Sequence, residues 1–175
     1  MAKEKNKTIK TKQKYCITYS VCDGKDRFLR GGAKFIGANR EIDLSDRTEL
    51  AALREILEAE YCNRQRKEKI VIHAAERIDF EDFAKNTAGD GTEGKVTYVV
   101  AYCTPEAFAK TAGNIKGADN IRTVVIASDP ITDQKSLSDF MCKLTNRRNI
   151  CMPTKETCVI LSIKPETKFE KEEAA

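Results

Sequence analysis

Residues 15–22 are Tyr-Cys-Ile-Thr-Tyr-Ser-Val-Cys, the stretch from which the fold class can be worked out. It is rich in aromatic and β-branched residues, which favour a strand. Its large side chains occupy alternate positions, and a strand would place them on one face: Tyr15, Ile17, Tyr19 and Val21. The pattern therefore predicts a strand with one face buried in a core.

A second strand is expected after a short turn. Residues 23–26 (Asp-Gly-Lys-Asp) have the composition of a turn. Residues 28–38 (Phe-Leu-Arg-Gly-Gly-Ala-Lys-Phe-Ile-Gly-Ala) predict the strand. Glycine inside a strand often marks a bulge, so we expect this strand to be broken or bulged at Gly31-Gly32.

A helix and a third strand complete the first half of the chain. Asp46 and Glu49 have the spacing of a capping box, and apolar residues at helical spacing then continue to Tyr61. Residues 70–73 (Ile-Val-Ile-His) predict a strand, and residues 79–88 predict a short helical turn.

The second half repeats this order with one additional helix. Residues 96–102 predict a strand, and Thr104-Pro105 then has the cap and first-turn proline of a helix start. Residues 121–127 predict the next strand, a further helix is expected from near Asp133, and residues 158–163 predict the last strand.

The repeated order indicates an internal duplication, with chance patterning as the alternative. The predicted equivalent positions are Cys22 with Cys103, Ile36 with Val125, Leu57 with Leu144, and Val71-Ile72 with Val159-Ile160. We therefore predict an α+β fold in which two ββαβ units form a pseudo-twofold body, with mixed or antiparallel sheet and helices on one side. The two sheets would either join edge to edge or pack face to face.

Residues 89–94 (Gly-Asp-Gly-Thr-Glu-Gly) match the G-x-G-x-x-G spacing of dinucleotide-binding proteins. That fingerprint must follow a strand and open a helix, whereas this one precedes a predicted strand. A flexible linker between the units is the better interpretation. The predicted divisions are a disordered basic arm (1–14), a first repeat (15–88), the linker (89–94), a second repeat (95–163) and a charged tail (164–175).

The seven cysteines are odd in number, and no two have C-x-x-C spacing. Several lie in apolar runs, where a free thiol behaves as a small hydrophobe. This usage favours a reducing, cytoplasmic compartment and disfavours a zinc site. No run approaches the ~18 apolar residues of a membrane span, so we expect no membrane partner.

The sequence contains no recognisable catalytic motif. His73 is the only histidine, and its place after a buried-type strand predicts a structural role. Neither H-E-x-x-H nor the phosphate-binding G-x-x-x-x-G-K-[ST] is present. We expect no catalytic residue, cofactor or metal. The alternative is that Asp43, Asp46 and Asp129 converge to hold a metal ion.

Basic residues are the strongest candidates for a functional site. The arm holds six lysines and a single glutamate, so the rest of the chain, whose total net charge is +4, is close to neutral. Further cations follow the first strand and both main helices. The predicted nucleic-acid-binding residues are Lys3, Lys5, Lys7, Lys10, Lys12, Lys14, Lys25, Arg27, Arg30, Lys34, Arg64, Arg66, Arg147 and Arg148.

These patterns favour a non-catalytic binding protein that is anchored by its basic arm to nucleic acid or a nucleoprotein assembly. A small regulator or inhibitor that binds a protein partner is about equally compatible with the sequence. A small metal-dependent enzyme acting on nucleotides or nucleic acid is a further alternative.

Overall fold

The chain is an α+β protein of two similar units in this computed structural model, which describes residues 12–79, 94–110, 121–146 and 158–166. The first unit contains β1 (Gln13–Cys22), β2 (Phe28–Ala38), α1 (Arg47–Tyr61), the short 3-10 helix η1 (Arg64–Arg66) and β3 (Lys69–Arg77). The second contains β4 (Val96–Cys103), α2 (Pro105–Lys110), β5 (Arg122–Ser128), α3 (Gln134–Asn146) and β6 (Val159–Pro165).

Each unit forms a three-stranded antiparallel sheet whose central strand is the first strand of the unit. The strand orders are β2-β1-β3 and β5-β4-β6. In both sheets the helix of the ββαβ unit connects the two outer strands, which are not hydrogen-bonded to each other. The predicted α+β class and the repetition of similar units are therefore confirmed.

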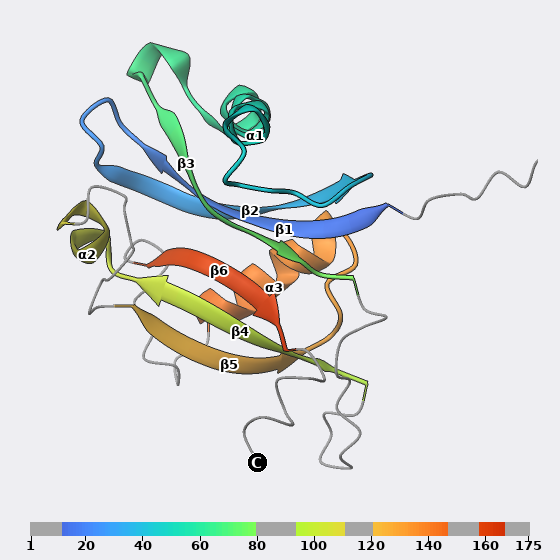
Figure 1. Cartoon of the computed structure of the whole chain (residues 1–175). Helices are drawn as coiled ribbons and strands as arrows, with labels where there is room; N and C mark the ends of the chain where they lie inside the picture. Colours follow the sequence, from blue (N-terminus) through green and yellow to red (C-terminus); the bar gives the residue numbers. More distant parts are fainter. Residues whose placement is uncertain (1–11, 80–93, 111–120, 147–157, 167–175) are drawn as a thin grey trace, which may run out of the picture.

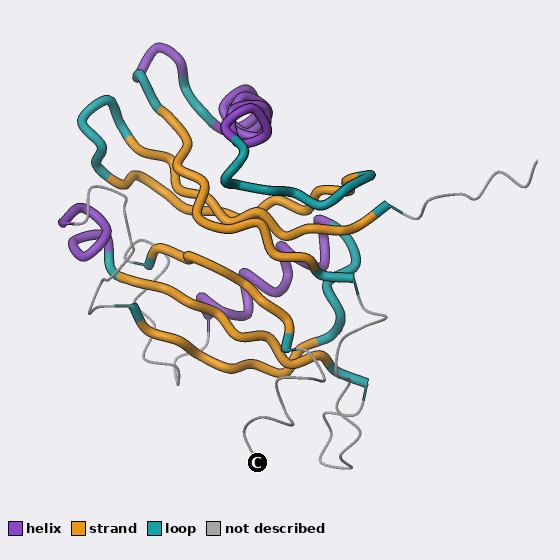
Figure 2. The backbone as a smooth tube through the Cα atoms, in the orientation of Figure 1, coloured by secondary structure: helices purple, strands orange, loops and turns teal. Residues whose placement is uncertain are grey.

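The two sheets lie one above the other rather than edge to edge (Figures 1 and 2). Helix α1 covers the outer face of the first sheet, whereas α3 lies at the level between the sheets and packs against β2. Strand β6 packs directly against β1 and β3. The first sheet is therefore covered on both faces, by α1 on one side and by the second unit on the other.

A β-bulge lies at the corresponding place in each sheet. The register of β1 with β3 shifts so that His73 has no pairing partner, and the register of β4 with β6 shifts so that Leu161 has none. The predicted alignment of Val71-Ile72 with Val159-Ile160 makes the two bulged residues, His73 and Leu161, equivalent. This part of the predicted duplication is confirmed, because a bulge is a specific feature that chance patterning would not repeat.

The pairing register shows that one predicted equivalence is wrong by one residue. Tyr15 and Tyr98 lie equally far before the bulge, and their partners are Ile36 and Ile126. Ile36 therefore corresponds to Ile126, which is buried, and not to Val125, which is 64% exposed. Because β5 has apolar residues at successive positions, Val124, Val125 and Ile126, the sequence pattern does not show which of them faces the core.

A second predicted equivalence is wrong by two residues. By the same count, Cys103 corresponds to Ser20 rather than to Cys22. The physical reason is that α2 begins immediately after β4, so that this strand ends earlier than β1 does. Leu57 and Leu144 are both buried against the sheets of their own units, as the alignment predicts.

Strand β1 is buried on both faces, and the prediction of a single buried face is wrong. The large side chains face α1 and form one core cluster with Leu57 and Ile70. The intervening small side chains are between 0% and 1% exposed: Cys16, Thr18, Ser20 and Cys22. These small residues allow the second unit to approach closely, so the face-to-face packing of the two sheets buries this face as well.

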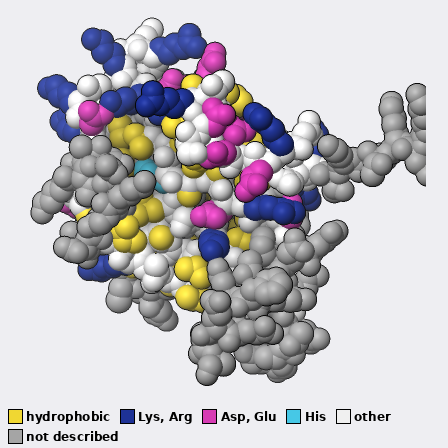
Figure 3. Space-filling model, in the orientation of Figure 1, with side chains coloured by type: hydrophobic (Ala, Val, Ile, Leu, Met, Phe, Trp, Pro, Cys, Tyr) yellow, Lys and Arg dark blue, Asp and Glu magenta, His cyan; other side chains and the backbone are white. Residues whose placement is uncertain are grey.

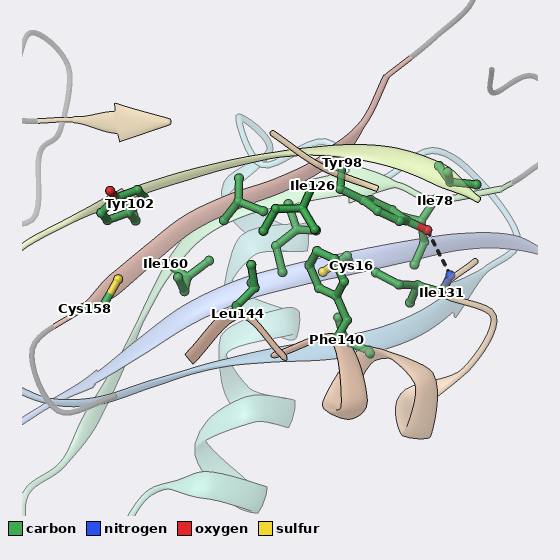
Figure 4. Close-up of a cluster of buried hydrophobic side chains, with 14 residues drawn as sticks. Cys16, Ile78, Tyr98, Tyr102, Ile126, Ile131, Phe140, Leu144, Cys158 and Ile160 are labelled. Carbon is green, nitrogen blue, oxygen red and sulfur yellow. Dashed lines mark hydrogen bonds between the residues drawn. The ribbon is translucent and has the colours of Figure 1, made fainter. Parts of the chain in front are cut away.

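The largest core cluster lies between the second sheet and α3, and Cys16 of the first sheet also belongs to it (Figure 4). The Tyr98 ring lies 5.0 Å from that of Phe140, measured between centroids. Its hydroxyl oxygen accepts a 2.9 Å hydrogen bond from the backbone N–H of Ile131, which satisfies the polar end of a buried ring.

A fully buried hydrogen bond is among the contacts that connect the two units. The Thr18 hydroxyl of β1 donates to the backbone carbonyl of Leu161 over 2.6 Å. Leu161 is the bulged residue of β6, so β1 contacts the place where the pairing of β6 with β4 is disrupted. Within the first unit, β1 also contacts the bulged residue of β3, since the Ser20 hydroxyl lies 2.7 Å from Nε2 of the His73 side chain.

The predicted break at Gly31-Gly32 is wrong, because β2 is continuous and its register shift lies nearer its start, opposite Val21 and Cys22. Gly32 is needed for a different reason. A Cβ atom there would lie 2.6 Å from the hydroxyl oxygen of Tyr19, whose ring covers the glycine. The Tyr19 ring is held in place by stacking on Tyr61, with 5.0 Å between ring centroids.

The predicted helix starts are largely confirmed. The Asp46 carboxylate accepts from the N–H groups of Thr48 and Glu49, as an N-cap should. The reciprocal half of the capping box differs, because Glu49 accepts from the N–H of Asp43 rather than from that of Asp46. Helix α2 begins at Pro105, as predicted.

Several of the predicted segments lie outside the residues that the structure describes. The helical turn at 79–88, the arm and the tail lie almost entirely outside the described residues, as does the linker apart from Gly94. Among the helices that the structure describes, none has the length and apolarity needed to cross a membrane.

We predict that Gly32→Ala destabilises the protein by about 1–3 kcal/mol, because the new methyl group overlaps the buried ring of Tyr19, which must give up its stacking on Tyr61 to make room. Gly31→Ala is the matched control, since its Cβ would be at least 3.6 Å from its neighbours. Urea unfolding of both variants measures the difference. Equal losses of stability would show that Tyr19 does not restrict position 32.

Candidate nucleic-acid interface

Two loops meet at one end of the first sheet. The β1–β2 turn closes with a 3.0 Å hydrogen bond from the N–H of Asp23 to the carbonyl of Arg27. The η1 loop is capped by Asn63 and ends at Lys67, whose positive φ of 54° turns the chain into β3. The loops touch, because a Cβ atom at Gly24 would lie 3.4 Å from that of Lys67.

The β1–β2 turn and the η1 loop together form a surface with an excess of positive charge. We call this surface the basic end. Its cations are Lys25, Arg27, Arg30, Arg64, Arg66, Lys67 and Lys69, and its carboxylates are Asp23, Asp26 and Glu68. Figure 3 shows Lys and Arg side chains gathered over this end of the molecule, at the upper left. A surface with this excess of cations attracts polyanions.

Three of the cations are paired with the local carboxylates. Arg27 contacts Asp23 at 2.7 Å, Arg30 contacts Glu68 at 2.8 Å, and Lys69 contacts Asp26. The remaining four are exposed, and no ion pair joins them to any residue that the structure describes: Lys25, Arg64, Arg66 and Lys67. The charge available to a ligand therefore comes mainly from the η1 loop.

The carboxylates at the basic end act as supports for the loops. Hydrogen bonds from the backbone and side chain of Arg27 lower the pKa of Asp23 to about 2. A hydrogen bond from Arg30 likewise lowers the pKa of Glu68, whose side chain also accepts from the N–H of Asn63. Both carboxylates remain ionised at neutral pH and hold their loops in place.

The basic end contains a shallow hollow of about 690 Å³. It is bounded by Arg30, Glu60 and Tyr61 on one side and by the η1 loop, residues 62–66 and Glu68, on the other. Arg30, one of the residues that line it, donates to the carbonyl of Tyr61 over 2.5 Å. The lining is polar and holds three cations, Arg30, Arg64 and Arg66, beside the carboxylates of Glu60 and Glu68. Arg64 and Arg66 are its available donors to an anionic group.

The structure brings together only part of the predicted set. Lys34 is paired with Glu60 at 2.7 Å and lies over the ring of Tyr61, so it contacts the border of the hollow but does not line it. Lys12 and Lys14 lie at the opposite end of β1 from the basic end. The other predicted cations lie outside the described residues: Lys3, Lys5, Lys7, Lys10, Arg147 and Arg148.

The sequence showed Lys67 and Lys69 in the run of cations after the first main helix, but the predicted set of binding residues did not include them. The pairing of Cys22 with Lys69 places the start of β3 beside the end of β1. No sequence signal identifies that pairing. The run of cations after α1 was visible, but its proximity to the β1–β2 turn was not.

His73 has the surroundings of a structural residue. Its ring meets that of Phe108 edge to face, with 5.5 Å between centroids, and Nε2 contacts the hydroxyl of Ser20. Burial lowers the pKa of His73 to about 4, so the imidazole is neutral at pH 7. It then accepts a hydrogen bond from Ser20 if the proton resides on Nδ1.

The hypothetical acidic metal site does not assemble. Asp43 and Asp46 organise the start of α1, whereas Asp129 faces Lys143 of α3 at 3.6 Å in the other unit. The described ranges contain no group of three or more His, Cys, Asp or Glu side chains placed to hold a metal ion.

No disulfide joins the cysteines that the structure describes, and most of these cysteines are buried. Burial raises the pKa of Cys16 and of Cys158 to about 12, so these thiols stay protonated and pack as apolar groups. Cys142 is exposed on α3.

Comparisons with known proteins give no relative: no protein-family model, no curated protein and no solved structure matches the chain.

We predict that lowering the pH from 7 to 4 costs stability through His73. Its pKa is 6.5 in the unfolded chain and about 4 when folded, so the unfolded state binds the proton first as pH falls. The loss should reach roughly 2–3 kcal/mol near pH 4. His73→Gln, which keeps an acceptor for Ser20 but does not titrate, should remove this pH dependence. Identical stability profiles for the two proteins in urea would contradict the prediction.

Proposed function

We propose that this protein is a non-catalytic binding protein whose basic end holds the phosphate backbone of a nucleic acid. The observation that supports this most is the η1 loop, which presents Arg64, Arg66 and Lys67 to solvent without ion pairs to other described residues. Exposed cations that no carboxylate neutralises can displace the counterions condensed on a nucleic acid, which is the main source of non-specific affinity.

The distance between the basic end and the lysines at the start of β1 favours a nucleic acid that lies along the protein surface. The basic end and the start of β1 are separated by the ten residues of that strand, or roughly 30 Å at the usual rise. Six lysines precede or begin β1. A nucleic acid that contacts both regions would run along the first sheet, and the arm would add to the salt-dependent part of the affinity.

We predict that replacing Arg64, Arg66 and Lys67 with glutamine lowers the dependence of affinity on salt. Each lost phosphate contact should reduce the slope of log affinity against log salt by about 0.7–0.9. The measurement is fluorescence anisotropy with single- and double-stranded RNA and DNA oligonucleotides at several salt concentrations.

The matched control replaces three exposed cations on helices away from the basic end, Arg47, Arg54 and Lys135. The control should keep the slope of the unmodified protein. Equal slopes for all three proteins would show that the basic end makes no phosphate contacts. Absence of affinity for every oligonucleotide at low salt would exclude nucleic acid as the ligand.

A further inference from the structure

We propose that a second surface of this protein, the outer edge of β2, binds an extended acidic peptide segment of a partner protein by strand addition. The surface is a groove of about 490 Å³ between β2 and α3, a size within the usual range for ligand sites. Its walls include Gly31, Gly32 and Ala33 on one side and Ser138 and Met141 on the other. We call it the edge groove.

The backbone of β2 is available in the edge groove. Strand β2 is the outer strand of its sheet and, among the strands that the structure describes, pairs only with β1. In an antiparallel pair, alternate residues direct both their N–H and C=O away from the partner. Because the N–H of Phe35 and the carbonyl of Ala33 both point outward to Gln134, the same alternation directs the N–H and C=O of Gly31 outward.

Gln134 marks where the available edge ends. Its side-chain oxygen accepts from Phe35 over 2.8 Å, and its nitrogen donates to Ala33 over 3.3 Å. The Gln134 side-chain amide thereby makes the same two hydrogen bonds to β2 that the backbone of a neighbouring β-strand would make. Toward the start of β2 no described residue takes this role, and the outward groups of Gly31 and the N–H of Ala33 open onto the groove.

Gly31 and Gly32 contribute no side chains of their own to protect this edge. Natural proteins usually protect such an edge with charged residues, proline or a covering loop. An extended peptide can approach a glycine backbone closely and add main-chain hydrogen bonds, as in known strand-addition complexes. Three outward groups are offered, so the added segment is short.

The lining and the flanking charge define the chemistry of the segment. Apolar groups of Tyr19, Leu29, Met141 and Ile160 line the groove and suit an apolar side chain. Arg30 and Tyr61 also border the hollow of the basic end, so the two surfaces are continuous. A segment in the groove would extend past Arg64 and Arg66, which favour carboxylates. The expected ligand therefore alternates β-branched or other apolar residues with Asp or Glu.

The test uses a positional-scanning library of fluorescein-labelled hexapeptides and the full-length protein. We expect selection of peptides that combine acidic with β-branched residues. Gly31→Pro removes one outward N–H at a position where an edge strand tolerates proline. It should weaken the selected peptide about tenfold or more, the effect of losing roughly 1.4 kcal/mol.

Gly37→Pro is the matched control, because Gly37 has the same outward orientation on β2 but lies beyond Gln134. It should change peptide affinity less than twofold. A second pair of variants leaves the strand unchanged: Ser138→Trp fills the groove from the exposed surface of α3, and Asp139→Trp, on the neighbouring exposed position, does not. Only Ser138→Trp should abolish binding.

Hydrogen exchange then locates the peptide. The amides of Gly31 and Ala33 should become protected when the selected peptide is bound, and that of Gly37 should not. Nucleic-acid affinity should be unchanged in Gly31→Pro, which separates this site from the basic end. The proposal is overturned if no peptide is selected, or if both proline variants weaken binding equally.

Two further outcomes would assign the edge to another occupant and overturn the proposal. Light scattering that shows a dimer, dissociated by Gly31→Pro, would mean that a second copy of the chain occupies the groove. Protection of Gly31 and Ala33 in the free monomer would mean that the chain covers its own edge.

Discussion

The structure depends on the burial of β1 from both sides. One face packs against α1 with large side chains, and the other is reduced to small residues so that the second unit can approach. The hydrogen bond from the Thr18 hydroxyl to the carbonyl of Leu161 lies in this contact and joins the central strand of one unit to the bulge of the other. A buried carbonyl left without this donor would cost about 1–3 kcal/mol.

Of the two surfaces that we propose for binding, the edge groove follows from this stacking and the basic end does not. Because α3 lies between the levels of the two sheets, it forms one wall of the edge groove, while β2 of the other unit forms the opposite wall. The basic end arises within the first unit, where the pairing of β1 with β3 brings two loops together. Arg30 borders both surfaces, so a ligand in either one changes the electrostatic environment of the other.

The sequence predicted the elements of the fold well because its local signals are strong. Alternation in 15–22, the cap at Asp46 and the proline at the start of α2 each have a local physical cause, and each gave the correct type of element. The repeated order also led to the duplicated unit. Register was predicted less well, since a run of apolar residues such as Val124, Val125 and Ile126 fits either face of a strand.

The features that could not be predicted from the sequence depend on contacts between residues far apart in the chain. The role of Gly32 depends on the Tyr19 ring across the strand pair, and the burial of Cys16 and Ser20 depends on a second layer of structure. The cations of the basic end were mostly predicted as candidates, but their grouping with Lys67 and Lys69 required the pairing of β1 with β3. The edge groove was not predicted, because its two walls come from different units.

The most direct test of this account is native-state hydrogen exchange on Thr18→Val, which removes the hydroxyl between the units at nearly constant volume. If the two sheets form one cooperative body, the amides of Ile17 in β1 and Val100 in β4 should lose the same free energy of protection, about 1–3 kcal/mol. Loss of protection in one sheet alone, with the other unchanged, would show that the units are independently stable and would contradict the shared core on which the account rests.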